Sequence, residues 1–218
     1  MTGPAPADTV RVREWLRVSA AISAALLLAV WVVARASTPD PTPLQFPGLT
    51  HPADLGDALR VFLRNLLVLA LHTMACVAGY LAGKSLPEEA QRYGGALRRV
   101  HDFAGPAAIA FVSAATIFSL ATQAYVLGSD ASTLAEQGGV SPALLLAGLL
   151  PHAVPELVAL FLPLAAWLIA SRRGEWESLR RATIVTTAIA LPVVAVSALV
   201  EVYVSPEVVL WLRSLHFV

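Results

Sequence analysis

Charged residues and cysteines are both scarce in this chain of 218 residues. Asp, Glu, Lys and Arg together make up only 14% of it, and the formal net charge is zero. The sequence therefore offers no basic surface of the kind that nucleic acid requires, and we expect no nucleic-acid partner. The single cysteine, Cys76, excludes an internal disulfide framework. The sequence also lacks a Walker-type glycine loop, so a role in transport would require a partner ATPase or oligomerisation.

Apolar residues, in contrast, are abundant. Hydrophobic residues account for 57% of the chain and occur in runs long enough to cross a bilayer. We therefore predict an all-α fold, a polytopic integral membrane helical bundle with about five transmembrane helices plus short interfacial helices. Residues 1–218 are predicted to form a single membrane domain. The predicted spans are approximately 18–36, 58–83, 103–128, 142–171 and 182–204.

The segments between these spans have distinct compositions. Thr38–Asp57 is rich in proline and is predicted to be a loop, as is Ser129–Ser141. Pro87 and the two glutamates that follow it suit the first turn of a short interfacial helix. The tail, Pro206–Val218, has the alternation of a helix that lies along the membrane surface.

The first apolar run has two interpretations. Ala34-Arg35-Ala36 could be a signal-peptidase site, but the run is longer than a usual signal core, so we favour a retained transmembrane helix. Eleven of the fifteen Lys and Arg residues lie at the N-terminus and in two connections, Lys84–Arg99 and Arg172–Arg181. The other two connections, Thr38–Asp57 and Ser129–Ser141, contain no Lys or Arg. The positive-inside rule then places the N-terminus in the cytoplasm and the C-terminus outside.

Ionisable residues inside the predicted spans mark a candidate site, because they are costly at membrane depth. His152 and Glu156 lie four residues apart in the fourth span and so share a helix face. Asn65 and His72, seven apart, share a face of the second span, and Glu201 lies near the end of the fifth. At about 1.5 Å per residue, all five fall near the midplane or in the outer half of the membrane.

Imidazole and carboxylate groups together suit a zinc ion, which takes three protein ligands at a catalytic site. His72, His152 and one glutamate, Glu156 or Glu201, would be the metal ligands. The other glutamate could act as the general base or as a fourth ligand, and Asn65 could orient a ligand or polarise a substrate carbonyl.

A structural interpretation of the same residues stays open. The fourth span also contains Pro151, Pro155 and Pro163, so it should be kinked or locally opened, and His152 could simply cap a carbonyl freed there. Glu201 could pair with Arg60 or Arg64. His72 alone is more often a helix-contact histidine than a ligand. The polar residues would then fix helix packing without any chemistry.

Three segments carry a resemblance to a known family. Leu149-Leu150-Pro151-His152-Ala153-Val154-Pro155-Glu156-Leu157 resembles the Pro-His-Gly-x-x-Glu-Leu motif of the stage II sporulation protein M family. Glu201 followed by Ser205-Pro206 resembles that family's closing motif, and Arg64-Asn65 resembles its Arg-Asn segment. The chain departs from the family pattern at Ala153, where the family has glycine, and at Pro155.

The resemblance implies a polytopic protein of the bacterial plasma membrane. It also implies one of two roles, as a scaffold in a peptidoglycan-remodelling assembly or as a partner in the maturation or export of ribosomally made peptides such as circular bacteriocins. Two hypotheses follow, and the sequence favours the first, because two histidines and two carboxylates at a matched depth exceed what helix packing needs. The first is a membrane-embedded, zinc-dependent peptidase or hydrolase that acts on a hydrophobic peptide. The second is a non-catalytic scaffold or export partner, which binds a hydrophobic peptide or a membrane protein. The sequence also allows a homo-oligomer.

Overall fold

The computed structural model describes residues 6–216 and is almost entirely helical, without strands in that range. The prediction of an all-α membrane bundle is confirmed: five of the described helical segments are long and apolar enough to cross a membrane. The remaining residues of the predicted domain and of the tail helix, 1–5 and 217–218, lie outside the described range.

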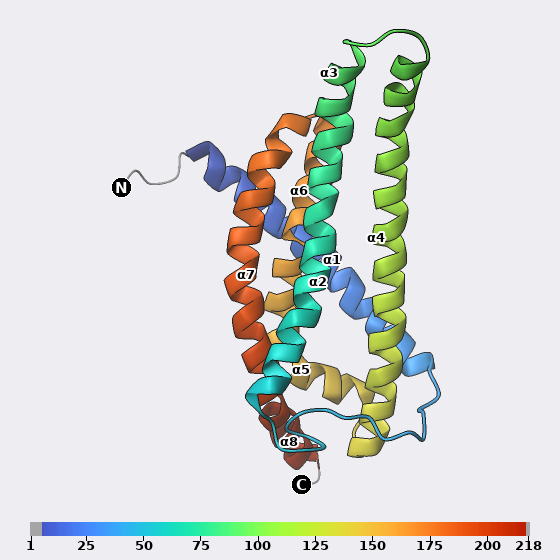
Figure 1. The fold of residues 1–218 in the computed structure, drawn as a ribbon. Coiled ribbons are helices and arrows are strands. Elements are labelled where there is room, and N and C mark those ends of the chain that lie inside the picture. The colour runs from blue at the N-terminus through green and yellow to red at the C-terminus, as the bar shows by residue number, and fades with distance from the viewer. Residues whose placement is uncertain (1–5, 217–218) are drawn as a thin grey trace.

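Five long helical segments run through the bundle (Figure 1). Their helices are α1 (Pro6–Ala36), α2 (Leu55–Tyr80), α4 (Gly95–Gly138), the pair α5 (Pro142–Leu160) and α6 (Leu162–Arg173), and α7 (Leu179–Tyr203). A π-helical turn, η1 (Leu81–Ser85), and α3 (Leu86–Ala90) extend α2, and a 3-10 turn, η2 (Trp176–Ser178), precedes α7. The final helix, α8 (Ser205–His216), lies beyond α7 at the C-terminal end (Figure 1).

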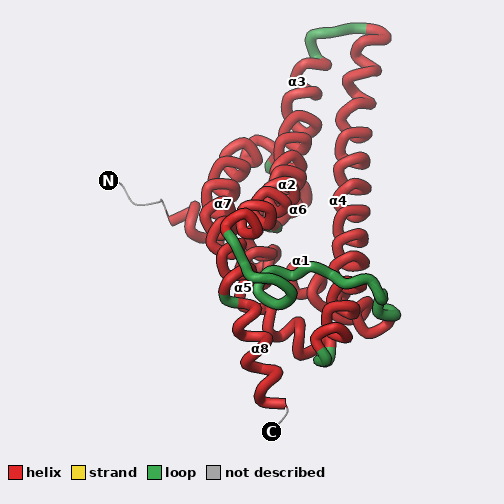
Figure 2. Tube along the Cα trace, turned by 60° about the horizontal axis from the view of Figure 1, so that its bottom comes forward, coloured by secondary structure: helices red, strands yellow, loops and turns green. Residues whose placement is uncertain are grey.

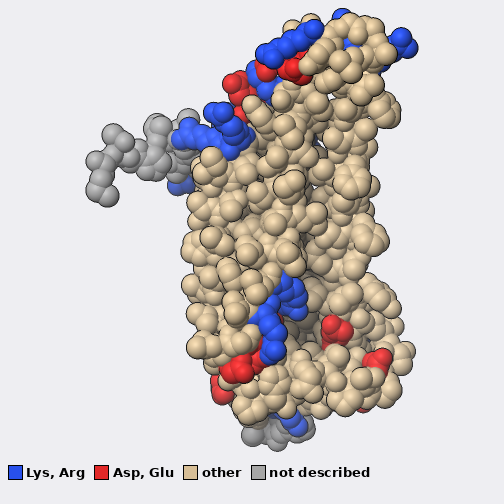
Figure 3. Space-filling model, in the orientation of Figure 1, with Lys and Arg blue, Asp and Glu red and all other residues tan. Residues whose placement is uncertain are grey.

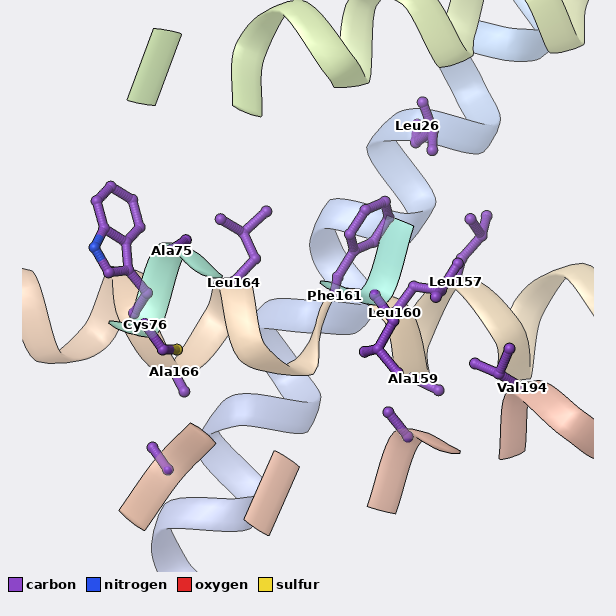
Figure 4. Close-up of a cluster of buried hydrophobic side chains, with 14 of the residues drawn as sticks. Leu26, Ala75, Cys76, Leu157, Ala159, Leu160, Phe161, Leu164, Ala166 and Val194 are labelled. Atoms are coloured by element: carbon purple, nitrogen blue, oxygen red, sulfur yellow. The ribbon is translucent and has the colours of Figure 1, made fainter. Parts of the chain in front are cut away.

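The α5–α6 span occupies the centre of the bundle. In its most apolar window 67% of the residues are buried, against 11–33% in the other four spans, which turn much of their apolar surface to lipid. The core around it includes Leu26 of α1, Leu69 of α2 and Val194 of α7. Figure 4 shows several of these side chains gathered along α5 and α6. A polar residue on the central span is therefore enclosed by protein on most sides.

The central span is interrupted between α5 and α6. Phe161, with φ −91° and ψ 0°, separates the two helices, and Pro163 stands in the first turn of α6. Proline has no backbone N–H, and its ring crowds the carbonyl of the residue four positions earlier. The predicted opening of this span is therefore located at Pro163, whereas Pro151 and Pro155 lie inside the continuous helix α5.

Two predicted boundaries differ from the structure. Most of Ser129–Ser141 is helical, because α4 continues to Gly138, so the prediction of a loop there is wrong. Ala131 and Ala135 are buried against neighbouring helices, and this packing supports the extra turns. The second span runs without a break through α3, so the Pro87 segment extends that span and does not form a separate interfacial helix.

Residues 37–54 connect α1 to α2 and cross the end of the bundle that is nearest α8 (Figure 2). We call this segment the strap. Its first half is tied to α4: Gln137 accepts a hydrogen bond from Leu44 N and donates one to Thr42 O. Its second half lies against the α7–α8 junction. Gly48 has φ +80°, and a Cβ there would collide with the Pro206 ring.

Candidate functional site

His152 and Glu156 of α5 line a cavity of about 530 Å³ that opens among α1, α2, α4, α5 and α7. Both side chains are buried, with 7% of each residue exposed. They lie on the same side of α5, as their spacing of four residues requires. Leu44–Pro47 of the strap also lines the cavity, so the site lies toward the α8 end of the bundle.

Glu201 near the end of α7 and Ser205 at the start of α8 lie next to His152. The Nε2 atom of His152 lies 3.9 Å from Glu201 Oε2, which is an ion-pair separation and too long for a direct hydrogen bond. The other ring nitrogen, Nδ1, is 2.7 Å from the Ser205 hydroxyl oxygen. Ser205 is fully buried and is the first residue of α8, and Pro206 follows it. Two side chains of the α7–α8 junction therefore orient the imidazole.

Arg64 and Asn65 bring α2 to the same cavity. Arg64 Nη2 lies 3.7 Å from Glu201 Oε1, so Glu201 stands between a guanidinium and an imidazole. Of the two partners that the sequence suggested for Glu201, the structure pairs it with Arg64, while Arg60 pairs with Asp57. Asp130 of α4 also lines the cavity. Asp130 was not among the predicted site residues, because it lies in a segment that was predicted to be a loop.

Two buried polar atoms at the cavity have no hydrogen-bond partner among the described residues: Nδ2 of Asn65 and Oε2 of Glu156. Both residues line the cavity, and the Asn65 side chain lies near the Glu156 carboxyl group as a potential donor, although the two unpaired atoms do not meet the geometry of a hydrogen bond. A buried polar atom without a partner costs about 1–3 kcal/mol. One unpaired donor and one unpaired acceptor, on two residues that line a single cavity, are groups that a polar ligand could satisfy.

His72 lies elsewhere. It is fully buried on α2, its Nδ1 is 3.1 Å from the Leu160 carbonyl oxygen, and its ring packs edge-on against Phe161. One turn later Cys76 donates from its thiol to the Pro163 carbonyl at 3.0 Å. These two α2 side chains satisfy carbonyls at the break in the central span. His72 does not line the cavity that holds His152, Glu156, Glu201 and Asn65.

This arrangement does not fit the predicted zinc ligands. In residues 6–216 no group of three or more His, Cys, Asp or Glu side chains is placed to hold a metal ion. The structure brings four of the five predicted site residues to one cavity and separates the fifth, His72, which was to be the third ligand. His152 and Glu201 approach each other, but the Ser205 contact occupies the second imidazole nitrogen.

The strap is held in a defined shape above the site. Ser132 donates to Ser37 O, and Thr133 accepts from Asp40 N, in addition to the two hydrogen bonds of Gln137. Hydrogen bonds from Thr42 lower the pKa of Asp40 below its ordinary value, so this carboxylate remains an acceptor into the acidic range. The cavity therefore has an ordered cover on the side of the strap.

The sequence model of the stage II sporulation protein M family matches residues 19–206. This chain belongs to the stage II sporulation protein M family. The family is membrane-associated, in agreement with the five spans. No curated protein and no solved structure matched the chain.

The cavity unites the segments that carried the resemblance to stage II sporulation protein M. The Pro-His segment of α5 supplies His152 and Glu156, the closing motif supplies Glu201 and Ser205, and the Arg-Asn segment supplies Arg64 and Asn65. The His152–Ser205 contact joins the first two segments directly, although 53 positions separate them. The motif residues of the family therefore form one three-dimensional site in this chain.

Proposed function

We propose that this protein resides in the bacterial plasma membrane, with its N-terminus in the cytoplasm and its C-terminus outside. The distribution of charge supports this orientation. Basic side chains gather at the end formed by the α3–α4 connection and the N-terminal part of the chain, and a broad uncharged band follows (Figure 3). The strap and the cavity lie at the opposite end, so the site would face the outer half of the membrane.

Within that membrane, the protein would serve as a non-catalytic partner that binds a hydrophobic peptide, as a scaffold or an export partner. One observation carries this proposal: Asn65 Nδ2 and Glu156 Oε2 are buried and unpaired, on two residues that line a largely apolar cavity of ligand size. These two atoms suit a ligand that brings both an acceptor and a donor.

The test uses the purified full chain in phosphatidylcholine nanodiscs and a short Leu/Ala peptide with a light-activated cross-linker. Ala153→Trp places a large ring in the cavity, where Ala153 is half-buried. Ala188→Trp is the matched control on an exposed face of α7. We expect cross-linking in the natural chain and in Ala188→Trp, and its loss in Ala153→Trp. Equal cross-linking in both variants would contradict a peptide site in this cavity.

The zinc-dependent peptidase is a second candidate, and the proximity of His152, Glu201 and Glu156 favours some form of hydrolysis. Glu156 would act as the general base, and Asn65 would donate to the carbonyl oxygen of the scissile bond. Because the described residues do not form a zinc site, no step is assigned to a metal ion. The scaffold hypothesis predicts that the cross-linked peptide is recovered intact.

Mass spectrometry of the peptide after incubation, together with metal analysis of the protein, separates the two candidates. Cleavage that is lost in His152→Ala and Glu156→Gln would favour the hydrolase. Stoichiometric zinc that is lost in the same variants would favour its metal-dependent form. An intact peptide and a metal-free protein would favour the non-catalytic binding function over the hydrolase.

A further inference from the structure

The cavity described above has an excess of carboxyl groups. Asp130, Glu156 and Glu201 line it, whereas Arg64 is the one Lys or Arg among its described lining residues. Arg64 already lies 3.7 Å from Glu201. Asp130 and Glu156 line the same cavity as this pair, so the four groups form one cluster. One guanidinium therefore faces three carboxyl groups, and the unpaired Glu156 Oε2 atom is left as an acceptor.

The rest of the lining is mainly apolar and comes from α1, α2, α4, α5 and the strap, for example Leu26, Val68 and Leu157. An apolar lining selects a ligand with an apolar body. The polar end of that ligand must bring hydrogen-bond donors and positive charge, because buried carboxyl groups are stable only when they are paired.

We propose that the cavity takes the free amino terminus of a hydrophobic peptide. This inference rests on the proposed peptide-binding function and specifies its substrate class. The terminal ammonium has three donors and no acceptor, so it would donate to Glu156 Oε2 within the field of Asp130. The first peptide carbonyl follows within a few bonds and would accept from Asn65 Nδ2. One ligand end thus satisfies both unpaired atoms.

Other amines fit less well. A lysine side chain holds its ammonium far from the peptide carbonyls, so it would leave Asn65 Nδ2 unpaired. An aminophospholipid brings an acceptor close to its ammonium, but that acceptor is an anionic phosphate. It would face three carboxyl groups and a single guanidinium that Glu201 already engages.

Two forms of the cross-linkable Leu/Ala peptide, with a free and with an acetylated amino terminus, test the inference on the full chain in phosphatidylcholine nanodiscs. We expect the free form to bind at least about tenfold more tightly, as hydrogen bonds to charged groups commonly contribute.

Glu156→Gln should remove most of this preference while the acetylated peptide binds as before. Asp130→Asn, at the half-buried edge of the cluster, should reduce the preference in the same direction. Glu207→Gln, an exposed position on α8, is the matched control and should leave the preference intact.

The outcomes are distinguishable. Equal binding of the two peptides would overturn the amino-terminus assignment and leave the peptide-binding function standing. The absence of binding by either peptide would overturn both. Competition by phosphatidylethanolamine added to the nanodiscs, with loss of the preference, would assign the amine site to a lipid and overturn the peptide assignment. Retention of the preference in both Glu156→Gln and Asp130→Asn would overturn the role of the cluster.

Discussion

Two buried histidines in this protein have different surroundings and so different roles. His152 is oriented by Ser205 and faces Glu201 across a cavity, whereas His72 is enclosed against Phe161 and bonded to a backbone carbonyl. The Leu160 carbonyl accepts the hydrogen of His72 Nδ1, so His72 Nε2 carries the lone pair, and it has no partner among the described residues. His72 therefore stabilises the break in the central span.

The first prediction concerns His72. We expect His72→Ala to lower the free energy of unfolding by about 2–4 kcal/mol, because it leaves a buried carbonyl unpaired and a void beside Phe161. His72→Gln keeps a donor and should lose less. Denaturation of the purified protein in mixed detergent micelles measures both variants. Loss of a bound metal ion with unchanged stability would contradict this assignment and restore His72 as a ligand.

The second prediction concerns the His152–Ser205 contact. A double-mutant cycle of His152→Ala and Ser205→Ala should show a coupling free energy of about 1 kcal/mol, since each single change removes the same hydrogen bond. Ser214→Ala, an exposed serine of α8, serves as the control and should show no coupling to His152. Additive effects of the two cavity substitutions would mean that Ser205 does not orient the imidazole.

For single residues, the sequence predicts which polar side chains are costly to bury in a membrane span, but it does not predict where those side chains point. His152 and Glu156 share a face because of their local spacing, which the sequence shows directly. The partner of His72 is a carbonyl 88 positions away, and that carbonyl needs a partner because the helix breaks at Pro163. Such pairing depends on how α2 packs against the central span, and a single sequence does not contain it.

For the helices, the sequence likewise predicts one property and not another: it predicts which spans exist, but not where they end. Apolar length predicts the existence of all five spans, since a bilayer requires about 20 apolar residues in a helix. Their ends are set by packing. The polar segment after residue 128 remains helical because Ala131 and Ala135 bury against neighbours, and α4 ends only where Gly139, with φ +62°, provides a left-handed cap.

The strap leads to the third prediction. Gln137→Ala removes the two hydrogen bonds that tie residues 42 and 44 to α4, so the strap should open more often. A thiol at Ala153→Cys in the cavity reports this opening, because the native Cys76 is fully buried. We expect a water-soluble maleimide to react with this thiol at least about fivefold faster after Gln137→Ala. Loss of about 1 kcal/mol from the free energy that holds the strap closed implies this factor.

The control is Gln91→Ala, an exposed glutamine in the α3–α4 connection at the opposite end. This substitution should leave the labelling rate of Ala153→Cys unchanged. An equal rate in Gln137→Ala and in the parent protein would show that ligands do not reach the cavity past the strap. Entry between helices from the bilayer would then be the route to examine.

The whole molecule is longer than the membrane that it crosses. The helical segment Leu55–Ala90 has 36 residues, and α4 has 44. At about 1.5 Å per residue they extend roughly 54 Å and 66 Å, against a hydrocarbon core of about 30 Å. We therefore expect the α3–α4 hairpin to project from the bilayer at its basic end, where Lys84, Arg92 and Arg99 are found, and the strap to lie at the other face of the membrane.

The last prediction tests this orientation with single cysteines. Pro43 is exposed on the strap, and Gly94 is exposed in the α3–α4 hairpin with open space around it. In whole cells, a membrane-impermeant maleimide should label Pro43→Cys at once and Gly94→Cys only after permeabilisation. The parent protein is the control, because Cys76 is fully buried and should stay unlabelled in both conditions. The reverse pattern would place the cavity on the cytoplasmic side, so a peptide would have to reach it from inside the cell. Labelling of both positions in intact cells would instead show that the basic connections do not determine the topology of this chain.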